Sequence, residues 1–263
     1  MNQLRSDTPE VLFSLDDGIA ILKLNRPDRM NAVNASLRRR LISMLQECDA
    51  NEGVRAIVLM GEGGRALSSG QDLDELAGIG WDGIVGWQEE QKSLLDAVRR
   101  LSKPCITAVE GICVGLGFHL ALCSDWRIAP ANSTWGQPEV KVGLASIVGP
   151  YLMSLHVGHT HNVQLSLMAD LITGQRAFDI GLLTEMCEEG RALETAMKRA
   201  RRLAALPSTA VRLTKQRLCA ITQPGLDEAF VAGIRAQLEC FSNGEPQQMI
   251  GEFIAKRTGA ARS

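Results

Sequence analysis

The sequence has no excess of charge of either sign. Among its 263 residues, 28 Lys and Arg stand against 30 Asp and Glu, which gives a formal net charge of -2 at pH 7. A protein without a net positive field has no general electrostatic attraction for the phosphates of a nucleic acid. We therefore expect no nucleic-acid partner.

Long hydrophobic runs are also missing. No apolar stretch approaches the roughly 20 residues that a membrane-spanning helix needs, and residues 1–15 lack the basic-then-apolar pattern of a secretory signal. We expect a cytoplasmic protein with no membrane partner. The composition, 45% hydrophobic and 22% charged, excludes a disordered chain and suits one sizeable core, alone or with a small appendage.

Paired cysteines are absent as well, because the seven cysteines are scattered without a C-x-x-C pair. An odd number in mostly apolar surroundings indicates reduced core residues, and the spacing fits no zinc site. Three histidines, His156, His159 and His161, lie close together. Because Gly158 interrupts the segment and no carboxylate stands at helical spacing from them, we interpret it as a polar helix start. The sequence therefore predicts no metal site.

Strand patterns occur in the first part of the chain. Residues 11–15 and 19–24 are strand-like runs joined by an Asp-Gly turn, the kind of turn that closes a tight hairpin. Unbroken apolar runs at 56–60 and 105–109 predict strands that are covered on both faces.

Helical patterns alternate with these strands. Apolar residues at helical spacing behind a polar Asn34 predict a helix over 37–48, and a second pattern covers 94–101. The alternation is typical of βαβ units with covered parallel strands, so we predict an α/β fold. After residue 148 the pattern becomes helical, and it predicts helices at 193–206, 208–222, 226–242 and 247–257.

Three glycine-rich segments could bind an anion. The segment 61–65 lacks the Gly-Lys-Ser/Thr end of a nucleotide-binding loop. After the segment 115–117, Leu120 replaces the third glycine of a dinucleotide fingerprint, which argues against a nicotinamide-dependent oxidoreductase. The third segment, 68–73, is a sharp turn between a strand and a helix. It is either a plain turn or a place where exposed amides stabilise a developing oxyanion.

Several motifs occur in the order found in one known family. They are Asn25-Arg26-Pro27 with Asn31-Ala32, Ser69-Gly70-Gln71-Asp72-Leu73, Lys103-Pro104 followed by Gly111-(x)3-Gly115-Leu116-Gly117, Cys123-Ser124-Asp125, Gly136-Gln137-Pro138-Glu139-(x)3-Gly143, Thr173-Gly174-Gln175, Gly181-Leu182-Leu183, Pro207 with Lys215, and Phe253-(x)2-Lys256-Arg257. This set resembles the crotonase superfamily, the enoyl-CoA hydratase/isomerase family. The resemblance covers nearly the whole chain.

The resemblance implies a fold and a substrate class. The family fold is a spiral of stacked ββα units with a helical C-terminal part that makes trimers, often paired into hexamers. It divides this chain into a core at 1–195 and a helical oligomerisation part at 196–263. The implied partners are an acyl-CoA substrate and two or five further copies of the chain, and no metal or redox cofactor is implied.

The resemblance also assigns an oxyanion hole, formed by the backbone N–H groups of Gln71 and Leu116. Most family members have glycine at the position of Leu116. Two N–H groups aimed at a thioester oxygen stabilise an enolate, and each is worth roughly 3 kcal/mol in comparable acyl-transfer sites. Glu139 matches a catalytic carboxylate, and a carboxylate beside an apolar acyl pocket has its pKa raised towards neutrality.

His119 stands where the hydratases of the family have a second glutamate. Hydration needs a water held between two groups, whereas one carboxylate suffices to move a double bond, so we predict enoyl-CoA isomerisation. Hydration with His119 in place of one glutamate is the alternative, and a catalytically silent CoA-binding protein is an alternative of another class. His119 itself could orient Glu139 or a water, act as the acid or base of a changed reaction, or be a helix histidine without chemistry.

Contacts to CoA are implied less sharply. By resemblance, Arg26, Arg29 and Lys256 lie near the CoA phosphates, and Lys256 reaches a neighbouring subunit's ligand. Backbone groups near Ala66 and Ser68 would hold the adenine, and Gly70 and Asp72 belong to the same binding turn. The acyl length of the substrate cannot be deduced, because residues 77–92, which would shape the pocket, follow no recognisable sequence pattern.

Overall fold

The computed structural model describes residues 9–260 of the chain. Residues 1–8, part of the segment analysed for a signal pattern, lie outside the described residues, as do 261–263. The chain opens with the expected hairpin, in which β1 (Val11–Asp16) pairs antiparallel with β2 (Ile19–Leu24). Asp17 and Gly18 have φ angles of 48° and 75°, the left-handed pair that a tight hairpin turn needs.

Three successive units of strand, strand and helix follow the hairpin. Their first strands are β3 (Ala56–Gly61), β5 (Cys105–Ala108) and β7 (Trp126–Pro130), which join one six-stranded sheet in the order β1-β2-β3-β5-β7-β10. Their second strands are β4 (Ala66–Ser68), β6 (Ile112–Val114) and β8 (Thr134–Gly136), which form a second sheet in the order β4-β6-β8-β9. The edge strands are β9 (Ile172–Thr173) and β10 (Glu185–Cys187). Strands of three residues are too short to show a hydrophobic period, so the sequence pattern gave no bounds for the second sheet.

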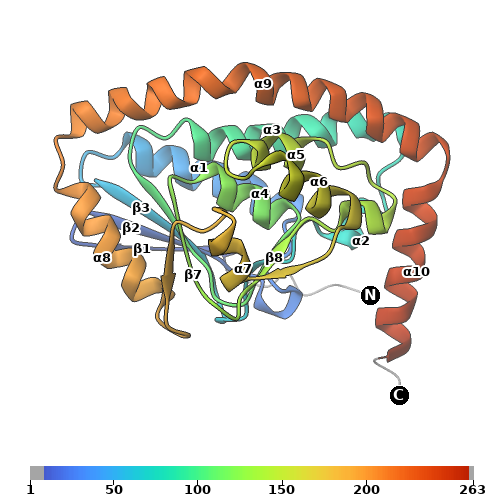
Figure 1. The fold of residues 1–263 in the computed structure, drawn as a ribbon, viewed down its shortest axis with the longest axis horizontal. Coiled ribbons are helices and arrows are strands. Elements are labelled where there is room, and N and C mark those ends of the chain that lie inside the picture. The colour runs from blue at the N-terminus through green and yellow to red at the C-terminus, as the bar shows by residue number, and fades with distance from the viewer. Residues whose placement is uncertain (1–8, 261–263) are drawn as a thin grey trace.

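Helices cover both faces of the six-stranded sheet (Figure 1). α8 (Ala192–Ala204) packs on one face, where its buried residues meet Ile19, Val58 and Ile106. α1 (Ala35–Ala50), α3 (Ile84–Arg99) and α4 (Leu116–Cys123) contribute to the larger core on the other face. Successive residues of β2 and β3 alternate between these two cores, as the two-residue period of a strand requires. The boundary at 195/196 falls inside α8.

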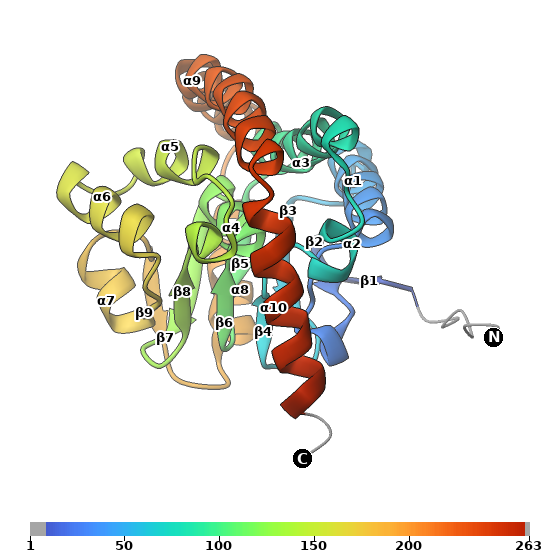
Figure 2. The ribbon, with the colours of Figure 1, turned by 90° about the vertical axis from the view of Figure 1, so that its right-hand side faces the viewer.

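The remaining helices lie after the second strands of the units and at the C-terminal end of the chain. α2 (Leu73–Leu76) follows β4, and α5 (Val148–Ser154), α6 (His159–Met168) and α7 (Gly174–Asp179) follow β8. α9 (Ser208–Ser242) runs over α3 and α5, and α10 (Glu245–Ala260) descends at one end of the molecule (Figures 1 and 2).

The prediction of separate helices at 208–222 and 226–242 is wrong, because α9 is one helix of 35 residues with Pro224 inside it. Proline removes a backbone hydrogen bond and normally ends or kinks a helix. Here neighbouring helices hold the interrupted turn. The Tyr151 hydroxyl donates to the Thr222 carbonyl, Arg99 Nη2 donates to Thr222 Oγ1 at 2.7 Å, and the Tyr151 ring packs where a side chain at Gly225 would lie.

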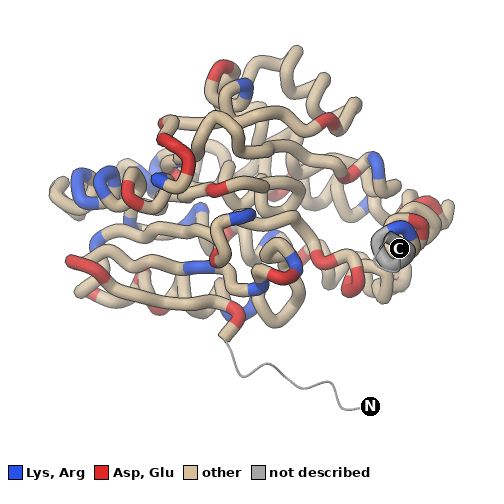
Figure 3. Tube along the Cα trace, turned by 90° about the horizontal axis from the view of Figure 1, so that it is seen from below, with Lys and Arg blue, Asp and Glu red and all other residues tan. Residues whose placement is uncertain are grey.

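Charges of both signs are interspersed along the chain, as Figure 3 shows for one face. No helix in the described part of the chain is both long and apolar enough to cross a membrane. All seven cysteines are free, four of them buried and three partly buried. Burial raises the pKa of Cys105 and Cys123 to about 12, so these thiols are inert core groups.

Candidate active site

A cavity of about 540 Å³ lies between β6 of the four-stranded sheet and the helices α2, α3, α5 and α9. Its wall contains five of the residues singled out from the sequence: Gly70, Gln71, Leu116, His119 and Glu139. They come from the turn after β4, the start of α4 and the short helical turn Glu139–Val142. The fold therefore brings both expected oxyanion donors and both expected acid–base residues to one place.

Two glycines let the oxyanion turns approach each other. Gly70 has a φ of 99° and Gly115 a φ of 54°, values that side-chain-bearing residues rarely adopt. A Cβ on Gly70 would lie 3.4 Å from the Leu116 backbone nitrogen, so the turns are in direct contact. Among the described residues, neither the Gln71 N–H nor the Leu116 N–H has a hydrogen-bond acceptor. Both amides are thus available to a ligand oxygen.

Leu116 fits this turn without backbone strain. The left-handed step falls on Gly115, and Leu116 is already the first residue of α4. Its N–H is one of the unpaired donors of a helix start, where the helix dipole favours negative charge. The departure from glycine at this position therefore leaves the backbone donor in place.

Glu139 is a partly buried carboxyl group, with 18% of its side chain exposed, and it faces the same turns. Its Oε1 lies 3.4 Å from the position of a Cβ on Gly115, and among the described residues its buried Oε2 has no hydrogen-bond partner. Burial raises the pKa of Glu139 to about 7, opposed by a backbone hydrogen bond. The group is therefore divided between its acid and base forms near neutral pH.

His119 lies one turn into α4, with Nε2 at 3.8 Å from Glu139 Oε1 and 3.4 Å from Gln137 Oε1. Burial lowers the pKa of His119 to about 4, and its hydrogen bond to Gln137 opposes this shift only in part. The imidazole is neutral at pH 7. His119 and Glu139 are close neighbours and do not form an ion pair at that pH.

A chain of buried hydrogen bonds sets the direction of the His119 contact. Asn162 Nδ2 donates to the Pro150 carbonyl at 2.7 Å, Ser166 Oγ donates to Asn162 Oδ1 at 3.1 Å, and Gln137 Nε2 donates to Ser166 Oγ at 2.9 Å. Because a backbone carbonyl can only accept, this direction leaves Gln137 Oε1 as the acceptor that faces His119. His119 Nε2 then carries a proton and donates. Sequence reasoning did not single out Gln137, although it belongs to the motif that contains Glu139.

Gly149 on α5 closes this arrangement. A Cβ there would lie 1.7 Å from Gln137 Oε1 and 2.6 Å from His119 Nε2. Glycine is therefore required for the helix to pack against the amide and the imidazole.

The comparisons with known proteins agree with this geometry. The profile of the family described as enoyl-CoA hydratase/isomerase matches residues 14–260. The chain belongs to this family. It is 29% identical over 253 residues to a short-chain-enoyl-CoA hydratase of Clostridium acetobutylicum, covering 94% of this chain and 95% of that protein. It is 26% identical to a 1,2-epoxyphenylacetyl-CoA isomerase of Escherichia coli, with 94% and 96% covered.

Solved structures show the same fold. An enoyl-CoA hydratase/isomerase from Mycobacterium paratuberculosis superposes with a TM-score of 0.85 at 27% identity, covering 93% of this chain and 98% of that one. One from Xanthobacter autotrophicus gives 0.84 at 28% identity, with 95% and 94% covered. The predicted crotonase fold and the prediction that the protein is an enzyme of this superfamily are confirmed.

Arg26 and Asp72, two residues expected at the CoA site, form an ion pair with each other. Arg26 Nη1 donates to Asp72 Oδ2 at 2.7 Å and to the Ala32 carbonyl at 2.6 Å. Asp72 also caps α2, where its Oδ1 accepts from the backbone of Asp74 and Glu75. Although burial raises it, the hydrogen bond and charge of Arg26 lower the pKa of Asp72 overall. The pair fixes the turn that carries Gln71.

The other expected CoA residues differ in exposure. Arg29 forms an exposed ion pair with Asp74 at 3.0 Å, and Lys256 is exposed on α10, outside the cavity wall. Ala66 and Ser68 are buried. The Ala66 carbonyl accepts from Asn31 Nδ2 at 2.8 Å, and Ser68 Oγ accepts from the Gly70 N–H at 3.1 Å. The two buried residues therefore help to fix the backbone around the binding turn.

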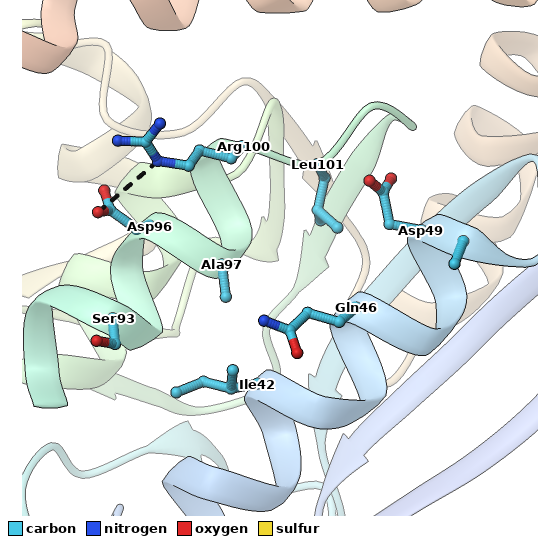
Figure 4. A pocket seen from close by; sticks show the side chains of 9 residues that line it. Ile42, Gln46, Asp49, Ser93, Asp96, Ala97, Arg100 and Leu101 are labelled. Atoms are coloured by element: carbon cyan, nitrogen blue, oxygen red, sulfur yellow. Dashed lines mark ion pairs between the residues drawn. The ribbon is translucent and has the colours of Figure 1, made fainter.

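Two other regions contain none of the residues expected at the active site. A groove between α1 and α3 is lined by Gln46, Asp96 and Arg100, and the last two are an ion pair at 3.7 Å (Figure 4). His156 lies in the turn between α5 and α6 and contacts the Leu122 carbonyl, so it is not part of the predicted helix start. Within residues 9–260, no group of three or more His, Cys, Asp or Glu is placed to hold a metal ion.

Proposed function

We propose that the protein is an enoyl-CoA isomerase that moves a double bond along the acyl chain of a CoA thioester. The N–H groups of Gln71 and Leu116 bind the thioester oxygen and stabilise the enolate that forms when a proton leaves the acyl chain. Glu139 takes that proton from one carbon and returns it to another. The electron pair moves through the enolate, so the reaction consumes no water and needs no second carboxylate.

The observation that carries this proposal is the state of Glu139. It is a partly buried carboxyl group with a pKa of about 7 and a buried, unpaired Oε2 beside the two free amides. A group that is both a fair base and a fair acid near neutral pH suits removal and return of one proton. The neutral His119, whose Nε2 faces Gln137, does not supply a second base from that atom.

Hydration of a 2-enoyl-CoA is the second candidate. Relatives named hydratases, such as the one from Clostridium acetobutylicum, support it. So does the 3.8 Å separation between His119 Nε2 and Glu139 Oε1, because the two groups could share a water. In that reaction Glu139 would take a proton from the water as the water oxygen adds to the β-carbon, and would return that proton to the α-carbon of the enolate, while His119 would orient the water.

One experiment separates these reactions. The protein is incubated with a panel of 2-enoyl- and 3-enoyl-CoA thioesters, and the products are identified by mass and chromatography. Conversion of a 3-enoyl-CoA into a 2-enoyl-CoA of equal mass supports isomerisation, and addition of one water supports hydration. Exchange of α-protons of a saturated acyl-CoA in heavy water tests the enolate step alone, since a silent CoA-binding protein would show no exchange.

The proposal extends to partners and assembly. We propose that Arg29 and Lys256 contact the CoA phosphates, with Lys256 acting from a neighbouring copy, and that the reaction uses no metal or redox cofactor. The proposed assembly is a trimer or a dimer of trimers formed through residues 196–263, in the cytoplasm.

A further inference from the structure

The face that α3 presents to the cavity is unexpectedly polar. Trp87, Gln88, Gln91 and Leu95 all line the cavity. Trp87 Nε1 and Gln91 Nε2 are buried donors without a hydrogen-bond partner among the described residues. Gln88, on the same face, is only 6% exposed. An inward helix face normally carries apolar side chains.

Polar groups also line the opposite wall. Gln237 on α9 donates through Nε2 to the Ala145 carbonyl at 2.8 Å, which leaves its buried Oε1 without a partner in the described structure. The neighbouring Ser146 Oγ is buried and unpaired in the same way. The two walls approach each other, because Gln88 Oε1 lies 3.7 Å from where a Cβ on Gly233 would stand, one turn before Gln237.

These unpaired atoms are concentrated in one place. Of the eleven buried side-chain N and O atoms without a partner in the described part of the chain, seven belong to residues that line this cavity. Three of these atoms lie on Gln71 and Glu139 of the candidate active site, and four lie on the two walls described above. Buried polar groups are almost always hydrogen-bonded, because leaving one unpaired is costly. A cluster of such groups around a cavity therefore indicates a ligand that supplies the missing partners.

We propose that the acyl group of the substrate carries a hydroxyl group beyond the reacting carbons, bound by the side chains of Trp87, Gln88, Gln91, Ser146 and Gln237. This inference rests on the proposed acyl-CoA reaction, which uses the oxyanion turns and Glu139. A hydroxyl group fits because it both donates and accepts. The wall offers it an acceptor in Gln237 Oε1 and donors in Gln91 Nε2 and Trp87 Nε1.

The charges of the wall disfavour a carboxylate at this position. Lys141 is the basic residue in the described lining, and it is exposed and paired with Asp170 at 2.9 Å. Apart from Glu139 Oε2, the unpaired groups of the lining are neutral amides, an indole and a hydroxyl. A buried carboxylate without a cation or a full set of donors would be strongly disfavoured.

Binding of unreactive acyl-CoA thioesters tests this inference. Saturated acyl-CoA chains of six, eight and ten carbons are compared by calorimetry with the same chains carrying a terminal hydroxyl or a terminal carboxyl group. At one length at least, we expect the hydroxylated chain to bind roughly tenfold more tightly than the plain chain, as two or three hydrogen bonds allow. We expect the carboxylated chain to bind less tightly than the hydroxylated one. Equal binding of plain and hydroxylated chains at every length would mean that only water meets these groups, and would overturn the inference.

Variants locate the effect. Gln91→Met and Gln88→Met keep the length of the side chain and remove the amide. Each should lower the ratio of affinities for the hydroxylated and the plain chain from about tenfold to about threefold or less, while plain chains bind as before. Gln46→Met is the matched control, since Gln46 is exposed in the groove between α1 and α3 (Figure 4), and it should keep the full preference. If both cavity variants melt like the parent protein and also keep the full preference, the assignment of these residues is overturned.

The test separates this inference from the proposed function. If plain acyl-CoA chains bind and exchange α-protons but the hydroxyl gives no advantage, the reaction stands and the substrate class falls. If no acyl-CoA binds at any length, the proposed function fails and this inference fails with it.

Discussion

Glu139 is the base that moves the proton in the proposed reaction. Glu139→Gln keeps the side-chain volume and removes the base, so turnover should fall at least about a hundredfold. Binding of a saturated acyl-CoA should stay within about twofold, which calorimetry can measure. A variant that retains more than about a tenth of the parent turnover would contradict the assignment.

The pH dependence of the reaction follows from the same carboxyl group. Because burial raises the pKa of Glu139 to about 7, the base form is lost as the pH falls below 7. We expect kcat/KM for isomerisation to be level above about pH 8 and to fall towards tenfold per pH unit well below pH 7. His119, with a pKa of about 4, adds no step in that range. A profile whose midpoint lies near 4.5, the ordinary value for a glutamate, would show that Glu139 is solvated in the working enzyme.

His119 is the residue whose replacement distinguishes the two candidate reactions. His119→Glu places a second carboxyl group near Glu139, because the present His119 Nε2 lies 3.8 Å from Glu139 Oε1. Two carboxyl groups can grip one water, so we expect measurable hydration of a 2-enoyl-CoA above the uncatalysed rate. One of the two pKa values should rise, because like charges held close disfavour double ionisation.

His119→Gln is the matched control for this variant. It keeps a neutral hydrogen-bond donor and should gain no hydration. The prediction fails if His119→Glu binds enoyl-CoA normally and still adds no water.

At the scale of elements, α5 packs closely against the active site because Gly149 has no side chain. Gly149→Ala puts a Cβ within 1.7 Å of Gln137 Oε1, so the helix or the amide must shift. We expect a loss of about 1–3 kcal/mol in the free energy of unfolding, typical of overpacking, together with reduced turnover as His119 moves.

Gly86→Ala on α3 serves as the comparison. Nothing lies within 4 Å of a Cβ there, and alanine favours a helix more than glycine by up to about 1 kcal/mol. This variant should be unchanged or more stable in thermal unfolding. Equal stability of both alanine variants would show that α5 adapts without cost.

Elements with a local cause were predictable from the sequence. Asp17 and Gly18 gave the hairpin turn, and Asn34 marked the start of α1, where its side chain accepts from the Leu37 N–H. α9 was not predictable in one piece, because Pro224 normally interrupts a helix and the groups that hold it, Tyr151 and Arg99, come from distant segments.

The candidate site divides in the same way. The residues that carry proposed chemistry lie in short motifs, so Gln71, Leu116 and Glu139 could be found by position. The polar lining of the cavity could not. Gln91 and Gln237 are far apart in the sequence, and each looks like an ordinary surface glutamine until α3 and α9 pack together.

At the scale of the whole molecule, α9 presents apolar side chains that the single chain does not bury. Leu213, Leu218 and Ile221 are more than half exposed. We expect sedimentation to give a mass three or six times the 28.5 kDa of the chain, with contacts from residues 196–263. Leu218→Asp should weaken that assembly, because it places a charge in an apolar contact.

Val85→Asp is the control for the assembly. Val85 is an exposed apolar residue of α3, outside the proposed contact region, so the variant should keep the parent mass. A stable and active monomer of the parent protein at micromolar concentration would refute the trimer and remove the proposed role of Lys256 across subunits.

The position of Trp87 gives the molecule an optical property. Of the four tryptophans, Trp81 is exposed, Trp126 lies beneath the Arg199 guanidinium, and Trp135 is buried with its Nε1 bonded to Ser133. Trp87 alone among them lines the cavity, with an indole N–H that has no partner in the described structure. Its emission therefore depends on what fills the cavity, and the intrinsic fluorescence of the protein becomes a reporter of occupancy that needs no label and no turnover.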